Sequence, residues 1–133
     1  MKKIQSGQAL VTLLVFVGLA TAVTAGAVAI AVINVQSTSQ FNQGQRAYDL
    51  AEAGAEDAIM HLERDQSFSS TGYTIQISSN NTFVVSVTPT GIATTKTIIS
   101  EGTVNIFKRK VQIVGSFDGN GVFSITSWNE IDD

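Results

Sequence analysis

The sequence Met1-Lys-Lys-Ile-Gln-Ser-Gly7-Gln8-Ala9-Leu10 leads without a gap into an apolar tract. Residues 9–35 carry no acidic and no basic side chain, which makes 27 consecutive uncharged positions. An α-helix needs about 20 predominantly apolar residues to cross the hydrocarbon core of a bilayer. The sequence therefore predicts a transmembrane helix over residues 8–35.

The helical pattern continues past Val35 to about Asp65, and no proline interrupts it. In residues 36–65 the apolar positions recur at helical spacing on a single face, which predicts an amphipathic second half of the same helix. The small residues of this half indicate that a sheet packs closely against it. The apolar face consists of Phe41, Tyr48, Ala51, Ala55, Ile59 and Leu62, and the small residues are Gly44, Ala47, Ala51, Gly54, Ala55 and Ala58.

Residues 66–133 have a different composition, which is typical of a β-sheet domain. A connector rich in serine, threonine and glycine follows Asp65, and runs of alternating apolar and polar residues come after it. Asn80-Asn81 and Asp118-Gly-Asn-Gly121 are turn sequences between such runs. The predicted strands cover residues 73–77, 83–87, 92–103, 108–117 and 122–128.

A sheet with one apolar face and a helix with one apolar face bury each other. The predicted fold class is therefore α+β, with a long N-terminal helix packed on a C-terminal antiparallel meander of four or five strands. We expect Trp128 to close one end of the core. The predicted core residues of the sheet are Phe83, Val85, Val87, Val111, Ile113, Phe117, Phe123 and Ile125.

Two motifs resemble those of a known family. Lys2-Lys3-x-x-x-Gly7, before a hydrophobic helix that runs into an amphipathic half, resembles the leader region of type IV pilins and pseudopilins. The run Tyr48-Asp-Leu-Ala-Glu52-Ala-Gly54-Ala-Glu56 is similar to a helix block of PilX-like minor pilins. The resemblance covers about the first half of the chain and implies a pilin-like fold.

The resemblance also implies a processing pathway and a set of partners. Residues 1–7 are then a leader peptide that a prepilin peptidase removes between Gly7 and Gln8, and Gln8 is then N-methylated. The helix packs with other pilin subunits in the core of a type IV pilus-like or type II secretion-like filament. The expected function is that of a structural minor pilin or pseudopilin.

The chain departs from the family pattern at two positions. Thr12 stands where the family usually has an acidic residue, which is thought to pair with the N-terminal amine of a neighbouring subunit. Because an unpaired charge is costly in a membrane, Thr12 favours a rare or tip-located subunit. The helix also lacks the family's kinking proline, since Pro89 is the only proline.

Charge on the N-terminal flank predicts the orientation in the membrane. Lys2 and Lys3 favour a cytoplasmic N-terminus, so we expect a single-pass protein of the cytoplasmic membrane that becomes part of an extracellular filament after assembly. The alternative is a membrane-anchored extracellular binding module that does not polymerise. A cleaved signal peptide is a further alternative, because Ala20-Thr-Ala22 and Ala25-Gly-Ala27 are small-x-small sites, although the tract is longer than a usual signal core.

Small residues recur in the predicted transmembrane segment at Gly18, Ala22, Gly26 and Ala29. Spacings of three and four place them on one stripe of the helix, along which another helix backbone can approach closely. These four residues are the candidate helix-packing site. Alanine and glycine are also common in membrane helices without such a role, and this alternative stays open.

Candidate chemical sites are absent from the sequence. It has no cysteine, no Gly-rich phosphate loop and no Gly-x-Ser-x-Gly motif, so we expect neither an enzyme nor a cofactor. Asp57 and His61, the only histidine, are four residues apart. Nothing joins them into a metal site, and a pair on the helix surface is expected instead.

The formal net charge of -3 argues against nucleic acid as a general partner. Lys108, Arg109 and Lys110 form the one basic cluster of the predicted sheet domain. A nucleic-acid contact is one interpretation of this cluster. The favoured interpretation is a charged strand edge that discourages pairing with the edge of another sheet.

Overall fold

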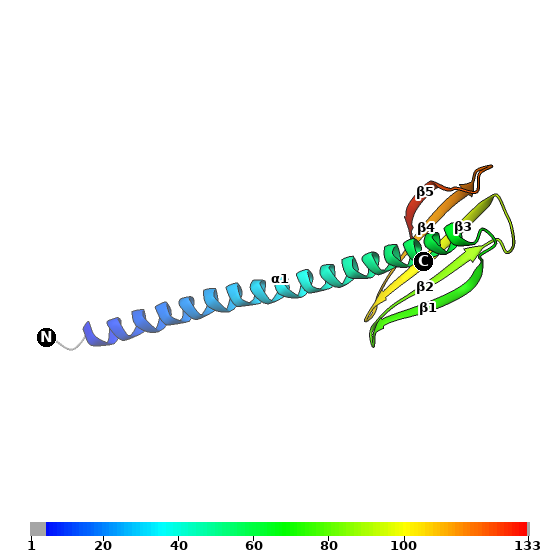
Figure 1. The fold of residues 1–133 in the computed structure, drawn as a ribbon. Coiled ribbons are helices and arrows are strands. Elements are labelled where there is room, and N and C mark those ends of the chain that lie inside the picture. Colours follow the sequence, from blue (N-terminus) through cyan, green and yellow to red (C-terminus); the bar gives the residue numbers. More distant parts are fainter. Residues whose placement is uncertain (1–4, 133) are drawn as a thin grey trace. The chain divides into compact units, whose positions relative to one another are not determined.

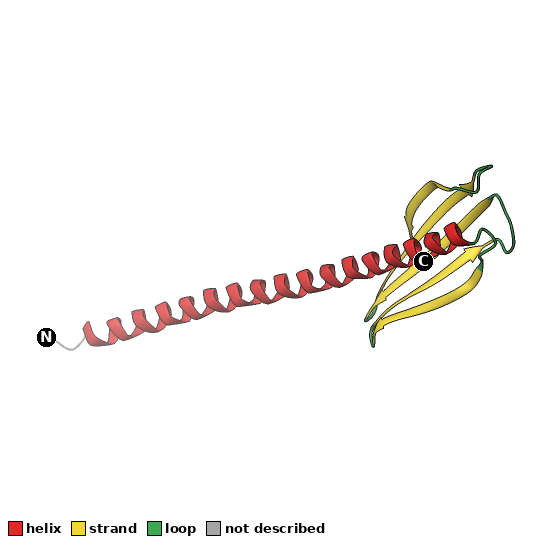
Figure 2. Cartoon of the chain, in the orientation of Figure 1, coloured by secondary structure: helices red, strands yellow, loops and turns green. Residues whose placement is uncertain are grey.

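The computed structural model describes residues 5–132 as one helix and five strands (Figures 1 and 2). The elements are α1 (Gln5–Arg64), β1 (Ser70–Ser78), β2 (Asn81–Thr88), β3 (Thr95–Val104), β4 (Phe107–Phe117) and β5 (Phe123–Ile131). The strands form one antiparallel sheet in the order β1-β2-β3-β4-β5. The predicted α+β fold class and the meander are confirmed, although β3 begins at Thr95 and not at residue 92.

The chain divides into two units between Gln40 and Phe41. The described part of the first unit is residues 5–40 of α1. The second unit contains the rest of α1 and all five strands, and we call its described part, residues 41–132, the head. The hydrophobic core lies in the head.

Helix α1 accommodates its threonines without losing backbone hydrogen bonds. Each of four threonine hydroxyls donates a hydrogen bond to the backbone carbonyl oxygen four residues earlier, which satisfies the hydroxyl within the helix. The donor–acceptor distances are 2.9 Å from Thr12 to Gln8, 3.0 Å from Thr21 to Val17, 2.7 Å from Thr24 to Ala20 and 2.9 Å from Thr38 to Asn34.

Helix α1 ends at Arg64 because Asp65 redirects the chain. The backbone N–H of Asp65 donates to the carbonyl oxygen of His61 at 2.9 Å, which closes the last turn. Oδ1 of Asp65 then accepts hydrogen bonds from the hydroxyl of Ser67 at 2.6 Å and from its backbone N–H at 2.9 Å. These hydrogen bonds lower the pKa of Asp65. The predicted end of the helix near Asp65 is confirmed.

Within the head, the helix approaches one face of the sheet at small residues. A Cβ added to Gly102 of β3 would overlap the helix backbone at Ala47 and Ala51. A Cβ added to Gly54 of the helix would overlap the Ser100 hydroxyl and the Phe83 ring. The two surfaces therefore approach more closely than larger side chains would permit, which confirms the close packing that the small residues predict.

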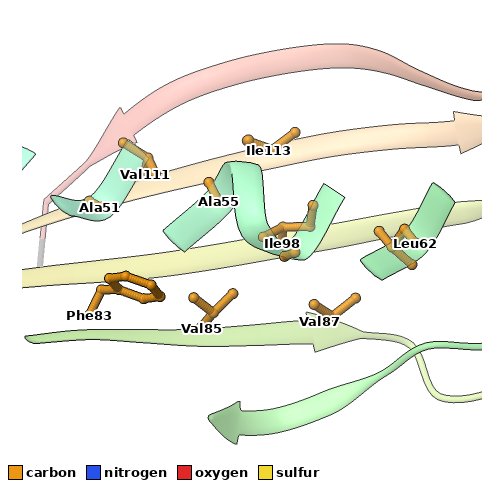
Figure 3. Packing of buried hydrophobic residues seen from close by; sticks show 10 residues of the cluster. Ala51, Ala55, Leu62, Phe83, Val85, Val87, Ile98, Val111 and Ile113 are labelled. Carbon is orange, nitrogen blue, oxygen red and sulfur yellow. The ribbon is translucent and has the colours of Figure 1, made fainter. Parts of the chain in front are cut away.

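The core consists of one layer of side chains between the helix and the sheet (Figure 3). Most of the predicted core positions are confirmed. The buried residues are Ala51, Ala55, Ala58 and Leu62 of α1, Phe83, Val85 and Val87 of β2, Ile98 of β3, and Val111 and Ile113 of β4. Tyr48, Ile59, Phe117, Phe123 and Trp128 are partly buried against them.

One residue of the predicted apolar helix face and one predicted core residue of the sheet are exposed, so these two predictions are wrong. Phe41 is 72% exposed, because the first fully buried helix position is Ala47, more than one turn later. Ile125 is 48% exposed. It pairs with Gly115 immediately before a register shift in the β4–β5 ladder, and the ring of Phe123 occupies the space over Gly115.

Candidate functional site: an exposed apolar helix segment

Every side chain in residues 7–40 is exposed, and we call this part of α1 the exposed segment. Its large apolar residues include Phe16, Val23 and Val35, each at least 70% exposed. Continuous apolar surface of this extent marks a contact with a membrane or with another protein. Among the described residues, α1 is the one helix long and apolar enough to cross a membrane. The segment is therefore compatible with membrane anchoring.

A helix in lipid must satisfy its polar groups internally, because no water is present to do so. The hydroxyls of Thr12, Thr21 and Thr24 meet this requirement through their hydrogen bonds to backbone carbonyl oxygens. These three side chains therefore add no unpaired donor to the apolar surface. Threonine at these positions is consistent with a lipid environment.

The predicted processing site lies at the start of the exposed segment. Gly7 and Gln8 are both helical and exposed, and a Cβ at Gly7 would meet no atom within 4 Å. Lys2 and Lys3 lie outside the described residues. The junction between Gly7 and Gln8 is thus sterically open.

The candidate packing stripe, formed by Gly18, Ala22, Gly26 and Ala29, is also open. All four positions are exposed, and a Cβ at Gly18 or Gly26 would meet no atom within 4 Å. Their spacing places them on one side of the helix. Because small residues permit a short distance between helix backbones, this stripe is able to receive a second helix.

The basic residues at the start of β4 are divided between the two faces of the sheet, because successive strand residues point to opposite sides. Lys108 Nζ lies 2.6 Å and Lys110 Nζ 3.2 Å from the carboxylate of Glu101, whereas Arg109 pairs with Glu130. The hydrogen bond from Lys108, together with Lys110, lowers the pKa of Glu101. The three bases therefore do not form a single cationic patch.

Strand β4 lies between β3 and β5, so the basic cluster is not on an edge strand of the sheet. The pairing of β5 with β4 ends at Lys110, so Lys108 and Arg109 pair only with β3. Lys110 is opposite Glu101 on one side and Ile131 on the other. The prediction of a charged edge strand is therefore wrong.

Asp57 and His61 belong to a cluster that joins the helix to β1. Nε2 of His61 lies 3.7 Å from Oδ2 of Asp57, and the hydroxyl of Tyr73 donates a hydrogen bond of 2.7 Å to the same oxygen. The His61 ring also stacks on Phe68, with 4.7 Å between the ring centroids. Burial and the hydrogen bond to Asp57 raise the pKa of Tyr73. The expected pair on the helix surface is present, and it supports the local packing.

Sequence reasoning missed Lys96, whose side chain is fully buried in the head. Its Nζ donates hydrogen bonds to the backbone carbonyl oxygens of Phe68 at 3.2 Å, Pro89 at 2.9 Å and Gly91 at 2.6 Å. Burial lowers the pKa of Lys96, and three acceptors match the three protons of the ammonium group. The sequence did hold one signal of this burial: Lys96 lies two residues before Ile98, so both side chains are on the same face of β3. The acceptors, however, lie in two separate connections.

Comparison of the chain with protein-family models, with curated proteins and with solved structures gives no match. The geometry supports a coarser description. A long, apolar N-terminal helix continues into a segment that packs on a five-stranded antiparallel sheet. This arrangement is compatible with a pilin-like fold.

Proposed function

We propose that this chain is a minor pilin or pseudopilin, a structural subunit of a type IV pilus-like or type II secretion-like filament. The observation that carries the proposal is the continuity of α1, in which an exposed apolar segment leads directly into a segment that carries a β-sheet. A protein that only displays a domain can use a flexible linker between anchor and domain. In a filament subunit an unbroken helix has a use, because the same helix packs in the filament and carries the head.

Assembly in this proposal is a transfer of apolar surface between two environments. Residues 8–35 first span the cytoplasmic membrane, with a cytoplasmic N-terminus and the head outside. A prepilin peptidase removes residues 1–7, Gln8 is N-methylated, and the helix leaves the lipid for a bundle of pilin helices in an extracellular filament. Its apolar surface stays out of water in both states, so the hydrophobic effect does not oppose the transfer. The small-residue stripe supplies close contacts in the bundle.

Thr12 bears on the position of the subunit in the filament. Its hydroxyl donates a hydrogen bond of 2.9 Å to the carbonyl oxygen of Gln8 in its own helix. Processing creates a cationic amine at Gln8, and Thr12 offers no negative charge to the amine of a neighbour. A subunit of this kind suits a rare position or the tip. Its partners are the peptidase, other pilin subunits and the membrane, and it catalyses no reaction.

The second candidate function is that of a single-pass, membrane-anchored extracellular binding module. Thr12 also favours this candidate, because a helix that never joins a filament has no neighbouring amine to neutralise. The two candidates share the membrane span and differ in processing. In the second, Met1 is retained and the helix does not polymerise.

Intact-mass measurement of the chain from its native cells tests the proposal. We expect a protein that starts at Gln8 and carries one additional methyl group. Retention of Met1 would support the anchored module and contradict the filament subunit. A start shortly after Ala22 or Ala27 would show cleavage of a secretory signal peptide and contradict both functions.

A variant at the processing site sharpens this test. A Cβ at Gly7 meets no atom within 4 Å in the described structure, so a Gly7→Leu chain should still fold its head normally. A bulky residue next to the scissile bond should block the peptidase, so the leader is retained and filaments are lost. Gly44→Leu, also at a helix position without an atom within 4 Å, is the control and should be processed normally. Normal processing of Gly7→Leu would place the cleavage site elsewhere.

A further inference from the structure

An open groove of about 210 Å³ lies in the head, between the helix and the ends of three strands. Three of its lining side chains are aliphatic, and that of Ile77 is 60% exposed. Open pockets with aliphatic walls and a few polar groups at the rim are where proteins bind ligands and partners. The aliphatic residues are Leu50, Ile77 and Val104, and the polar ones are Arg46, Asp49 and Asn81.

The cation at the rim of this groove has no ionic partner. Arg46 is exposed, and among the described residues its guanidinium forms no ion pair. Asp49 accepts a hydrogen bond of 3.2 Å from the side-chain amide of Gln45. A guanidinium stacks favourably on the face of an aromatic ring. Aliphatic walls beside an unpaired arginine therefore match an aromatic side chain.

The head exposes one such side chain. Phe41 is 72% exposed, whereas every other aromatic residue of the described head is at least partly buried. An apolar protein cavity of about 150 Å³ is large enough to bind benzene. The groove therefore has room for a phenylalanine ring.

Phe41 cannot enter the groove of its own chain. Leu50 follows it by nine residues, or about two and a half helical turns, so the two side chains point to opposite sides of α1. A surface and its complement on opposite sides of one molecule give a head-to-tail contact that repeats from copy to copy. The occupant that fits the groove is therefore Phe41 of a second copy.

The same positions define an offset between the two copies. Arg46 and Leu50 follow Phe41 by five and nine residues, which correspond to about 7 to 14 Å of helix. A copy with a parallel helix brings its Phe41 to this level when it is displaced by about 10 Å along the helix axis. Chains that span a membrane at equal depth lack this displacement. Successive subunits of a helical filament have an axial displacement.

We propose that the groove formed by Leu50, Ile77 and Val104 binds Phe41 of the neighbouring copy in the filament, with Arg46 against the face of the ring. The inference rests on the proposed filament subunit and adds the residues of a contact between copies. The contact forms on assembly and is absent between chains in the membrane. A rare subunit with this contact occurs as a run of successive copies.

Photo-crosslinking in the full-length chain tests the proposal. Phe41→p-azidophenylalanine keeps an aromatic ring at the position, and a covalent dimer shows that the label has reached a second copy. Ile77→p-azidophenylalanine labels the groove itself. Ile92→p-azidophenylalanine is the matched control, because Ile92 is 85% exposed but lies in the β2–β3 connection, at the other end of the sheet from Ile77. Filaments and membranes from the native cells are irradiated separately.

We expect roughly tenfold more covalent dimer in filaments with the label at position 41 or 77 than at position 92, because a ring held in a pocket stays near its partner. Mass spectrometry should place the crosslinks of position 41 around Leu50 and Ile77, and those of position 77 around Phe41. Arg46→Gln should lower the yield at position 41 by about two- to fivefold. Arg64→Gln, at another exposed arginine of α1, should leave it unchanged.

Several results would overturn the contact. Crosslinks from position 41 to position 41 of another copy, or to a different protein, would show that the groove is not the binding site. Equal yields in membranes and filaments would show that the contact needs no axial displacement. Absence of dimers from filaments that contain the processed chain would reject the groove and leave the proposed function intact. Absence of the processed, unsubstituted chain from filaments would instead contradict the proposed function.

Discussion

Helix α1 uses small residues in both of its parts, but with different results. In the head, a Cβ on Gly54 would overlap the side chains of the sheet, whereas in the exposed segment a Cβ on Gly18 or Gly26 would meet nothing. The first small-residue surface has its partner in the same chain. The second is free within the described residues. A single sequence feature, a stripe of small residues on a helix, thus indicates close packing without saying whether the partner is intramolecular.

The largest expected effect is on stability, and it concerns the close contact between the helix and the sheet within the head. Gly102→Ala introduces a Cβ where the helix backbone at Ala47 and Ala51 already lies. Backbone atoms cannot rotate away as a side chain can, so the helix must move off the sheet. We expect the free energy of unfolding to fall by about 3 kcal/mol or more, measured by denaturant unfolding of the full chain in detergent with near-UV circular dichroism.

Gly44→Ala is the control for this variant. Gly44 is also a small residue of the helix, but a Cβ there would meet no atom within 4 Å. Alanine favours a helix over glycine by about 1 kcal/mol, so the control should be as stable as the original chain or slightly more stable. Equal stability of Gly102→Ala and Gly44→Ala would show that the helix does not approach the sheet at Gly102.

A smaller loss of stability is expected when the connections beside the core lose their hydrogen bonds to Lys96. Lys96→Met keeps most of the side-chain volume but leaves the carbonyl oxygens of Phe68, Pro89 and Gly91 without the ammonium donor. Relief of the buried charge offsets part of this loss, so we expect a decrease of about 2 kcal/mol in the free energy of unfolding. Hydrogen exchange should become faster in the β2–β3 connection. Lys108→Met, at a side chain that is 54% exposed, should change stability by less than about 1 kcal/mol.

Association between the helices of different chains is tested by substitutions in the exposed segment. Gly18→Leu and Gly26→Leu fill the open stripe with bulky side chains. The head should unfold at the same denaturant concentration as the original, while association between helices should weaken by about 1–2 kcal/mol. Energy transfer between labelled chains in lipid bilayers measures the association. Ala20→Leu and Ala27→Leu lie on the other side of the helix and should associate normally. Weakening by all four variants alike would show that the stripe is not a specific packing surface.

The sequence predicted those parts of the molecule that depend on local periodicity. The extent of α1, the meander and most core positions follow from spacings of three, four and two residues. Phe41 and Ile125 were mispredicted because periodicity does not show where the helix first meets the sheet or where a ladder changes register. Lys96 was missed because its acceptors are backbone carbonyl oxygens of two irregular connections, whose course periodicity does not show. At the candidate site, periodicity identified the stripe but could not identify its partner.

The smallest expected effect concerns charge on the sheet face that does not contact the helix. The hydrogen bond from Lys108, with the contribution of Lys110, lowers the pKa of Glu101 below its ordinary value of 4.5. The stabilisation is therefore complete above about pH 4.5 and is lost as the pH falls through the lowered pKa. Because Lys108 is half exposed, we expect a change of about 1 kcal/mol or less, measured as unfolding free energy between pH 6 and pH 3. Glu101→Gln should remove this part of the pH dependence and leave helix association unchanged. A Glu101→Gln loss as large as that of Gly102→Ala would show that charge, and not close packing with the helix, holds the head together.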